Sequence, residues 1–132
     1  MTDESTKFFG LIRRAGKLEV GDMAVTSALQ NHKVKVVLMA SDSGGNTKKR
    51  IESISSDAHV PVVVTPWEKS LFSHAIGRDN VAVVGITDLG FAAAMMQKLS
   101  EEYPDRQEYT QKYTELSEKQ KLISSRKNDR RK

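Results

Sequence analysis

Val81-Ala-Val-Val-Gly-Ile-Thr-Asp88, followed by Leu89-Gly-Phe-Ala92, is the stretch of sequence that decides the fold. Its four leading apolar residues predict a strand that is buried on both faces. We expect Gly85 and Ile86 to break this strand into a loop, and Thr87 or Asp88 to cap the helix that follows. A strand that ends in an apolar loop beside a helix start can contact a base and a phosphate together, so this stretch favours nucleic-acid binding.

Working outward, the chain alternates predicted helices and strands, from a first helix to a last one. In the first helix we expect Ser5 as the cap, Phe8, Leu11 and Ile12 as the apolar stripe, and Gly16 at the end. Further strands are expected at residues 18–20, 35–40 and 60–65, and further helices from Gly21, from near Thr47, from Glu68 to Ile76 and around residues 91–99. Such alternation predicts an α/β fold, a central sheet with helices on both faces.

Composition excludes several kinds of protein. The 132 residues fit one domain, and because there is no cysteine, disulfides, thiolate metal sites and cysteine nucleophiles are excluded. No apolar run approaches the roughly 18 residues of a membrane span, and no signal sequence is evident. The three histidines have no paired carboxylate spacing, and Ser43–Lys48 lacks the order of a phosphate loop. We therefore expect a soluble, cytoplasmic, monomeric protein that is no enzyme and has no cofactor or metal.

Charge is unevenly placed along the chain. Residues 1–96 carry 11 Lys and Arg against 10 Asp and Glu, whereas residues 97–132 carry 10 against 7. We expect residues 1–100 to form the folded domain and residues 101–132 a charged extension, partly helical or disordered. Tyr109, Tyr113, Leu116 and Ile123 recur at helical spacing, which predicts a marginal helix, and Arg126–Lys132 is expected to be disordered.

The order of elements, together with residues 33–42, 60–62, 75–77 and 83–92, resembles one known family. The chain is similar to the kink-turn RNA-binding ribosomal proteins of the seven-Ae/thirty-e type, and among them to small bacterial members of the YlxQ kind. The resemblance covers residues 5–99. It implies a three-layer α/β/α sandwich around a four-stranded mixed sheet, and binding of RNA whose kink exposes tandem sheared G·A pairs.

The resemblance implies a binding surface in two parts, the start of the second helix and the loop after the last strand. The family's motif at the helix start is Gly-x-Asn-Glu-x-x-Lys. Gly21 matches it, but Met23, Ala24 and Ser27 hold the Asn, Glu and Lys positions. These three side chains cannot reproduce the donors and acceptors that suit guanine edges, which argues against strong kink-turn specificity.

The sequence therefore predicts an RNA-binding protein that recognises kink-turn-like structured RNA, ribosomal RNA included. Lys48 and Lys49 open the third helix, where cations are unfavourable unless they have another purpose, such as phosphate contact; a solvated charged face is the alternative. The alternative function is a protein adaptor that uses Met23 and the tyrosine stripe, and the charged extension is open either to nonspecific RNA contact or to a second protein. The residues expected to contact RNA are Arg14, Lys17, Gly21, Asp22, Met23, Ser27, Lys48, Lys49, Gly85, Ile86, Thr87 and Asp88.

Overall fold

The computed structural model describes the backbone of residues 1–130 and the side chains of residues 1–125. The chain divides into two compact units, Met1–Asp88 and a second one from Leu89 onward. In chain order the elements are α1 (Asp3–Arg14), β1 (Leu18–Val20), α2 (Asp22–Gln30), β2 (Val36–Met39), α3 (Gly45–Asp57), β3 (Val62–Val64), α4 (Lys69–Ile76), β4 (Val83–Ile86), α5 (Leu89–Glu102) and α6 (Gln107–Arg130).

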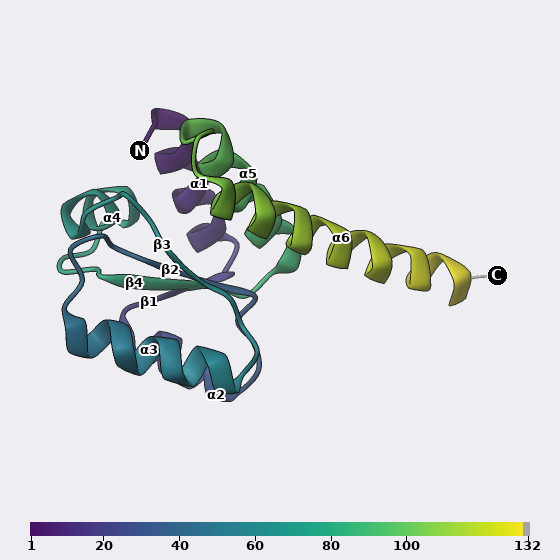
Figure 1. Ribbon diagram of the computed structural model, residues 1–132, viewed down its shortest axis with the longest axis horizontal. Coiled ribbons are helices and arrows are strands. Elements are labelled where there is room, and N and C mark those ends of the chain that lie inside the picture. Colours follow the sequence, from purple (N-terminus) through teal and green to yellow (C-terminus); the bar gives the residue numbers. More distant parts are fainter. Residues whose placement is uncertain (131–132) are drawn as a thin grey trace. The chain divides into compact units, whose positions relative to one another are not determined.

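The first unit is built on a four-stranded sheet with the strand order β1-β4-β2-β3 (Figure 1). β2 and β3 pair in parallel, whereas β4 runs antiparallel to both β1 and β2. The two central strands, β2 and β4, are buried along their whole length, as their continuous apolar runs predict. The mixed sheet and the α/β fold class are thereby confirmed.

Helices cover both faces of this sheet, so the first unit is a three-layer sandwich (Figure 1). On one face α2 and α3 pack side by side, with Val25, Leu29 and Ile51 in the core between them and the strands. On the other face lie α1 and α4, whose Phe9 and Phe72 meet Trp67 edge to face at ring-centroid distances of 5.8 and 5.9 Å. Trp67 is fully buried and anchors the packing of this face.

The first helix corrects two predictions. Its cap is Thr2 and not Ser5, because the Thr2 hydroxyl accepts a hydrogen bond from the Ser5 amide at 3.1 Å. The helix therefore begins earlier, and Phe9 replaces Phe8 beside Ile12 on the buried face, while Leu11 is exposed. Gly16 ends the helix region with φ +73°, in the left-handed conformation that was expected there.

The stretch that decides the fold also needs a correction. Gly85 and Ile86 do not form a loop, because they are the last two residues of β4 and are buried. A Cβ atom on Gly85 would lie 3.3 Å from both γ-carbons of Val34 and 3.7 Å from Val25 Cγ2. The glycine is thus a packing requirement of the strand, where neighbouring side chains approach the backbone closely.

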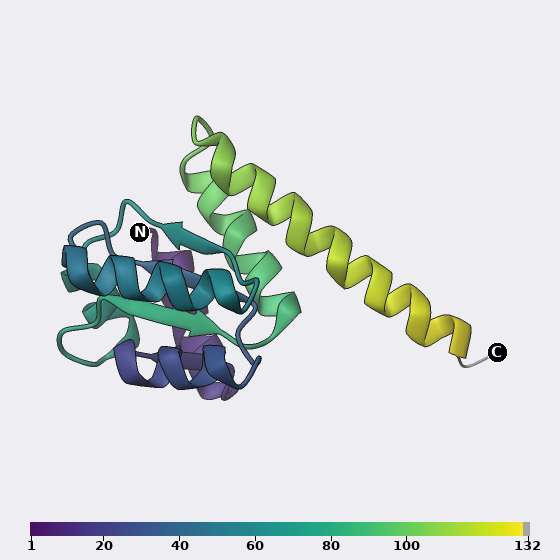
Figure 2. The same cartoon turned by 60° about the horizontal axis from the view of Figure 1, so that its bottom comes forward.

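The second unit is a pair of packed helices, α5 and α6, joined by a short turn that contains Pro104 (Figure 2). Tyr103 and Tyr109 contact each other at the turn, with ring centroids 6.3 Å apart. α6 continues to Arg130, beyond Arg126, where disorder was expected; residues 131–132 lie outside the described residues. Within the described part of the chain, every helix is too short or too polar to cross a membrane.

Candidate nucleic-acid interface

One end of the sheet gathers the features that could bind an anion. The strand register puts the ends of β1, β2 and β3 beside the beginning of β4, since Val20 pairs with Val84, Met39 with Val83 and Val64 with Met39. The chain leaves this end into α2, α3 and α4, and returns through the loop between α4 and β4. We call it the helix-start edge, meaning residues 21–27, 44–50 and 77–82.

Gly21 fixes the turn from β1 into α2. Its φ of +92° and ψ of 165° lie in a region that essentially only glycine adopts. The Gly21 amide donates a hydrogen bond to the Val83 carbonyl at 2.9 Å, and its own carbonyl accepts the first helical bond from Val25 at 3.0 Å. Because glycine has no side chain to cap the helix, the amides of the first turn of α2 face outward with the positive end of the helix dipole.

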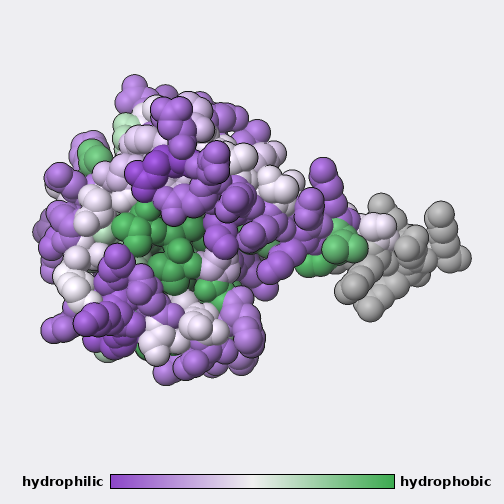
Figure 3. Space-filling model, viewed as in Figure 1, coloured by the Kyte–Doolittle hydropathy of each residue, from purple (hydrophilic) through white to green (hydrophobic). Residues whose placement is uncertain are grey.

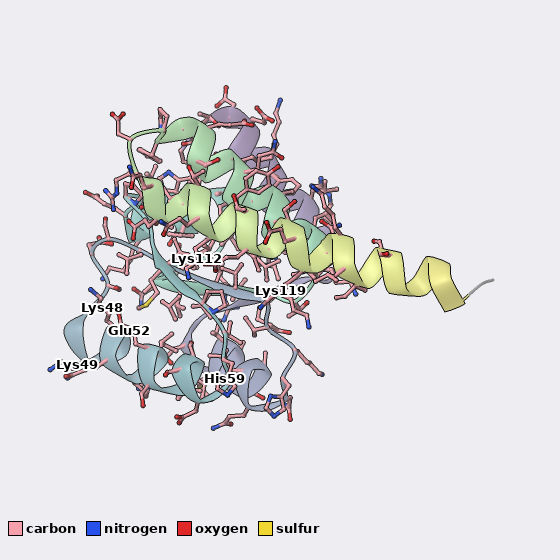
Figure 4. The ribbon with its side chains drawn as sticks, turned by 45° about the vertical axis from the view of Figure 1, so that its right-hand side comes forward. Lys48, Lys49, Glu52, His59, Lys112 and Lys119 are labelled. Atoms are coloured by element: carbon pink, nitrogen blue, oxygen red, sulfur yellow. The ribbon has the colours of Figure 1, made fainter. Side chains whose placement is uncertain are left out.

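α3 begins beside α2 at the same edge, and the two helices run in the same direction (Figure 2). It also starts at a glycine, Gly44, without a side-chain cap and without an acidic residue in its first turn. Lys48 and Lys49 project from this start, far from His59 at the other end of the helix (Figure 4). Both lysines are exposed, and neither forms an ion pair with any residue in the described range 1–125.

An ion pair between Arg50, in the second turn of α3, and Asp22, in the first turn of α2, links the two helices. Asp22 is the acidic residue in the first turn of α2, and Thr26 donates a hydrogen bond to it at 3.4 Å. The guanidinium of Arg50 offsets the carboxylate that would otherwise repel a phosphate. The start of α4 differs from the starts of α2 and α3, because the carboxylate of Asp42 already accepts a hydrogen bond from the Lys69 amide there at 2.8 Å.

The loop between α4 and β4 brings a cation that sequence reasoning missed. Arg78 donates to the Val20 carbonyl at 3.3 Å, which places it directly beside the β1–α2 turn. The loop is anchored by the Ala40 amide, which donates to the Ala82 carbonyl at 2.8 Å, while residues 77–80 are exposed. Gly77 and Asn80 have φ of +77° and +57°. The run Gly77-Arg-Asp-Asn80 is a recognisable turn signal, but only the register shows where it lies.

A shallow groove of about 340 Å³ runs along the outward face of α2. Met23 is 88% exposed at its rim, as the helical spacing predicts. The rest of the lining is polar and offers hydroxyl, amide and guanidinium groups, while the flexible thioether of Met23 can follow an apolar surface such as a base. The lining residues are Asp22, Met23, Thr26, Ser27, Gln30 and Arg50.

The structure therefore brings half of the predicted contact residues together. Gly21, Asp22, Met23, Ser27, Lys48 and Lys49 all lie at the helix-start edge. Thr87 does not, because β1 and β4 are antiparallel: the Thr87 amide donates to the Lys17 carbonyl at 2.9 Å, at the opposite end of β1 from Gly21.

The remaining predicted residues are displaced for the same reason. Asp88 directly follows Thr87 in the chain. Arg14 is the last residue of α1, three residues before Lys17, so both residues lie near the Lys17–Thr87 end of β1. Gly85 and Ile86 are buried in β4, where the Lys35 backbone amide donates to the Ile86 carbonyl at 2.7 Å, so they offer no surface to a ligand. The expectation that the turn before α2 and the loop after β4 form one surface is wrong, and the loop before β4 takes that place.

The fold and this edge define a small α/β/α domain with helix starts and unpaired cations at one end of its sheet. The chain belongs to the Ribosomal protein L7Ae/L30e/S12e/Gadd45 family, whose sequence pattern matches residues 4–96. It is 37% identical over 89 residues, 67% of this chain and 84% of the relative, to RNA-binding protein YlxQ of Enterococcus faecium. With RNA-binding protein YlxQ of Bacillus subtilis it shares 30% identity over 90 residues, 68% of this chain and 89% of the relative.

A similar solved structure comes from Bacillus halodurans and is described as a protein with unknown function. The superposition has a TM-score of 0.68 at 29% identity and covers 75% of this chain and 99% of the other. The shared part is therefore nearly the whole of that shorter protein, while part of this chain has no counterpart in it.

Proposed function

We propose that the protein binds structured RNA at the helix-start edge, and that the RNA it prefers is bent like a kink-turn. The observation that carries this proposal is the Gly21 turn, which sets the uncapped start of α2 beside Arg78 and the start of α3. The family membership and the printed name of the two relatives, RNA-binding protein YlxQ, support the same conclusion. Ribosomal RNA is the first natural candidate, given the family.

The phosphate backbone accounts for one half of the proposed contact. Two helix starts without side-chain caps offer outward amides, and helix N-termini are ready sites for anions. Lys48, Lys49 and Arg78 add exposed positive charge around them. Because these groups lie along one edge, they can follow consecutive phosphates of a strand, and such binding weakens as salt rises.

The groove on α2 accounts for the other half. A bend in RNA exposes unstacked bases, and proteins recognise RNA chiefly at such places. Met23 would pack on an exposed base, while Ser27 and Gln30 offer hydrogen bonds to its edge. Hydroxyls and one amide read a base edge less strictly than the family's Asn, Glu and Lys. We therefore expect recognition by shape, with modest preference for particular bases.

The test is a titration of the full chain with a fluorescently labelled kink-turn RNA and with a matched duplex in which Watson–Crick pairs replace the G·A pairs. We expect tighter binding of the kinked RNA, at 50 mM and at 150 mM salt. Equal binding of the two RNAs, lost on adding salt, would contradict the proposal and leave only a basic surface. A protein partner at Met23 would then be the reasonable alternative.

Three variants locate the site. Met23→Ala and Arg78→Gln should each reduce the affinity for the kinked RNA, by about 5-fold if each removes about 1 kcal/mol. Lys17→Gln is the matched control, since Lys17 is also exposed but lies at the other end of β1. A loss in Lys17→Gln that equals the loss in Arg78→Gln would place the binding site elsewhere.

A further inference from the structure

Charge segregates along α6 in a way that the fold does not require. Residues 107–118 contain one basic and three acidic residues. Residues 119–132, which we call the basic extension, contain seven basic residues and one acidic residue. A helix that only had to pack and stay in solution would mix both signs along its length.

Burial changes at the same point of the helix. Tyr109 and Leu116 are buried, whereas every residue from Glu118 to Ser125 is exposed. α6 has 24 residues and its neighbour α5 has 14, so α6 is longer by about 15 Å at 1.5 Å per residue. The far part of α6 therefore has no room to pack along α5, and a helix without a packed face gains little from tertiary structure.

The charges before and after this point also differ in their partners. Lys112 pairs with Glu115 at 3.3 Å, and Arg106 pairs with Glu108 at 2.9 Å. Lys119, two helical turns beyond Lys112 on the same side of α6 (Figure 4), forms no ion pair within residues 1–125, and neither does Lys121. The positive charges of Lys119 and Lys121 are thus available to an external anion.

We propose that the basic extension is a second RNA contact, which binds the phosphate backbone without regard to sequence. This inference rests on the proposed function, because it takes the same ligand to a second surface. The charge and composition of the extension favour RNA over a second copy of the chain and over a lipid surface. A second copy in parallel would bring seven further basic residues against these seven, and an antiparallel copy would offer them only the three acidic residues and one basic residue of residues 107–118.

A lipid surface is less suitable than RNA, because basic helices that lie on membranes need a broad apolar face. In the described part of the extension the large apolar residues are Leu122 and Ile123, exposed by 57% and 45%. Figure 3 shows a small hydrophobic patch, surrounded by hydrophilic side chains, near the end of the coloured part of the chain. The extension contains no aromatic residue that could anchor it at the lipid interface.

The experiment measures binding of a plain 20-base-pair RNA duplex across salt concentrations, using the full chain with Lys119→Gln and Lys121→Gln. Glutamine keeps the helix propensity of lysine, and circular dichroism verifies that helix content is unchanged. The control is Lys33→Gln with Lys35→Gln, two exposed lysines at the same spacing on the first unit. Adding Arg126→Gln and Lys127→Gln to the test variant doubles the change of charge.

We expect the slope of log K against log salt to become shallower by about one to two in the double variant and by about three in the quadruple variant, with less than one in the control. The kinked RNA should lose the same factor, so that the preference for it over the duplex is unchanged. Test and control variants that bind RNA alike would overturn the proposal. So would a test variant that loses vesicle binding or self-association while it binds RNA normally.

The two proposals fail separately. If the wild-type chain shows no preference for the kinked RNA while the test variant still loses affinity for the duplex, the proposed function fails at the helix-start edge and the basic extension remains an RNA contact. If the preference is present and the extension variants bind normally, the proposed function stands and the present inference is wrong.

Discussion

Replacing Gly21 with alanine should destabilise the first unit through backbone strain alone. No atom lies within 4 Å of a Cβ built on Gly21, so alanine meets no steric obstacle. Its φ of +92° with ψ of 165° is nevertheless a region that L residues avoid, at a cost of about 1–3 kcal/mol. Because the Gly21 amide and carbonyl hold β4 and α2, the turn cannot relax without losing these hydrogen bonds.

We expect the free energy of unfolding to fall by about 2 kcal/mol, and the melting temperature of a chain of this size by roughly 8 °C. Trp67 is the single tryptophan and is fully buried against Phe9 and Phe72, so its fluorescence reports the unfolding of the first unit. Urea and heat denaturation, each followed at Trp67, provide two independent measurements.

Gly45→Ala is the matched control. Gly45 opens α3 with ordinary helical backbone, and a Cβ there also meets nothing within 4 Å. Alanine at such a position stabilises by about 0.4–1 kcal/mol, because it restricts the unfolded chain. The reasoning about Gly21 is refuted if both alanine variants change stability in the same direction by the same amount.

Three further predictions concern residues outside the proposed interface. Ser55→Ala should leave the free energy of unfolding unchanged or raise it by up to about 1 kcal/mol in urea denaturation, because the buried Ser55 hydroxyl has no hydrogen-bond partner among the described residues; a loss above 1 kcal/mol would reveal a hidden partner. Asp42→Ala should cost about 1 kcal/mol in the same assay by removing the cap of α4, and an unchanged midpoint would show that the cap contributes nothing. Desolvation raises the pKa of the Tyr109 hydroxyl, against the opposing effect of Arg106, above its ordinary value near 10. The neutral phenol is thus favoured in the folded state, so stability is full below pH 10 and falls as pH rises above it; absorbance at 295 nm should show a late-ionising tyrosine that Tyr109→Phe removes, and three tyrosines ionising together would contradict this.

The sequence was sufficient to predict the layers of the fold but not its register. Continuous apolar runs at Val36–Met39 and in the stretch before Asp88 marked the two central strands, and Gly16 marked the end of the first helix. These are local signals, because burial on both faces and positive φ leave their trace in the residues concerned. Gly85 showed the limit of such signals, since the same residue type serves a loop or, as here, a tightly packed strand.

The sequence predicted only the part of the candidate interface that depends on local signals. The helix start at Gly21 and the cations at the start of α3 are encoded locally, and the structure has both at one edge. Which loop faces Gly21 depends on β1 and β4 pairing antiparallel, and spacing along the chain does not specify that. Arg78 was therefore missed, although its turn sequence was visible, and Thr87 was assigned to a site that lies at the other end of the strand.

The most direct test of the account is an amide nuclear magnetic resonance titration of the full chain with the kinked RNA. Because β1 and β4 pair antiparallel, the start of β4 lies at one end of β1 and the end of β4 lies at the other. Each end of β1 therefore has its own set of amides that can report binding. Our account predicts that the amides of Gly21, Met23 and Arg78 shift on binding, while those of Lys17 and Thr87 do not. Shifts confined to Lys17 and Thr87, with Gly21 and Met23 unmoved, would contradict it.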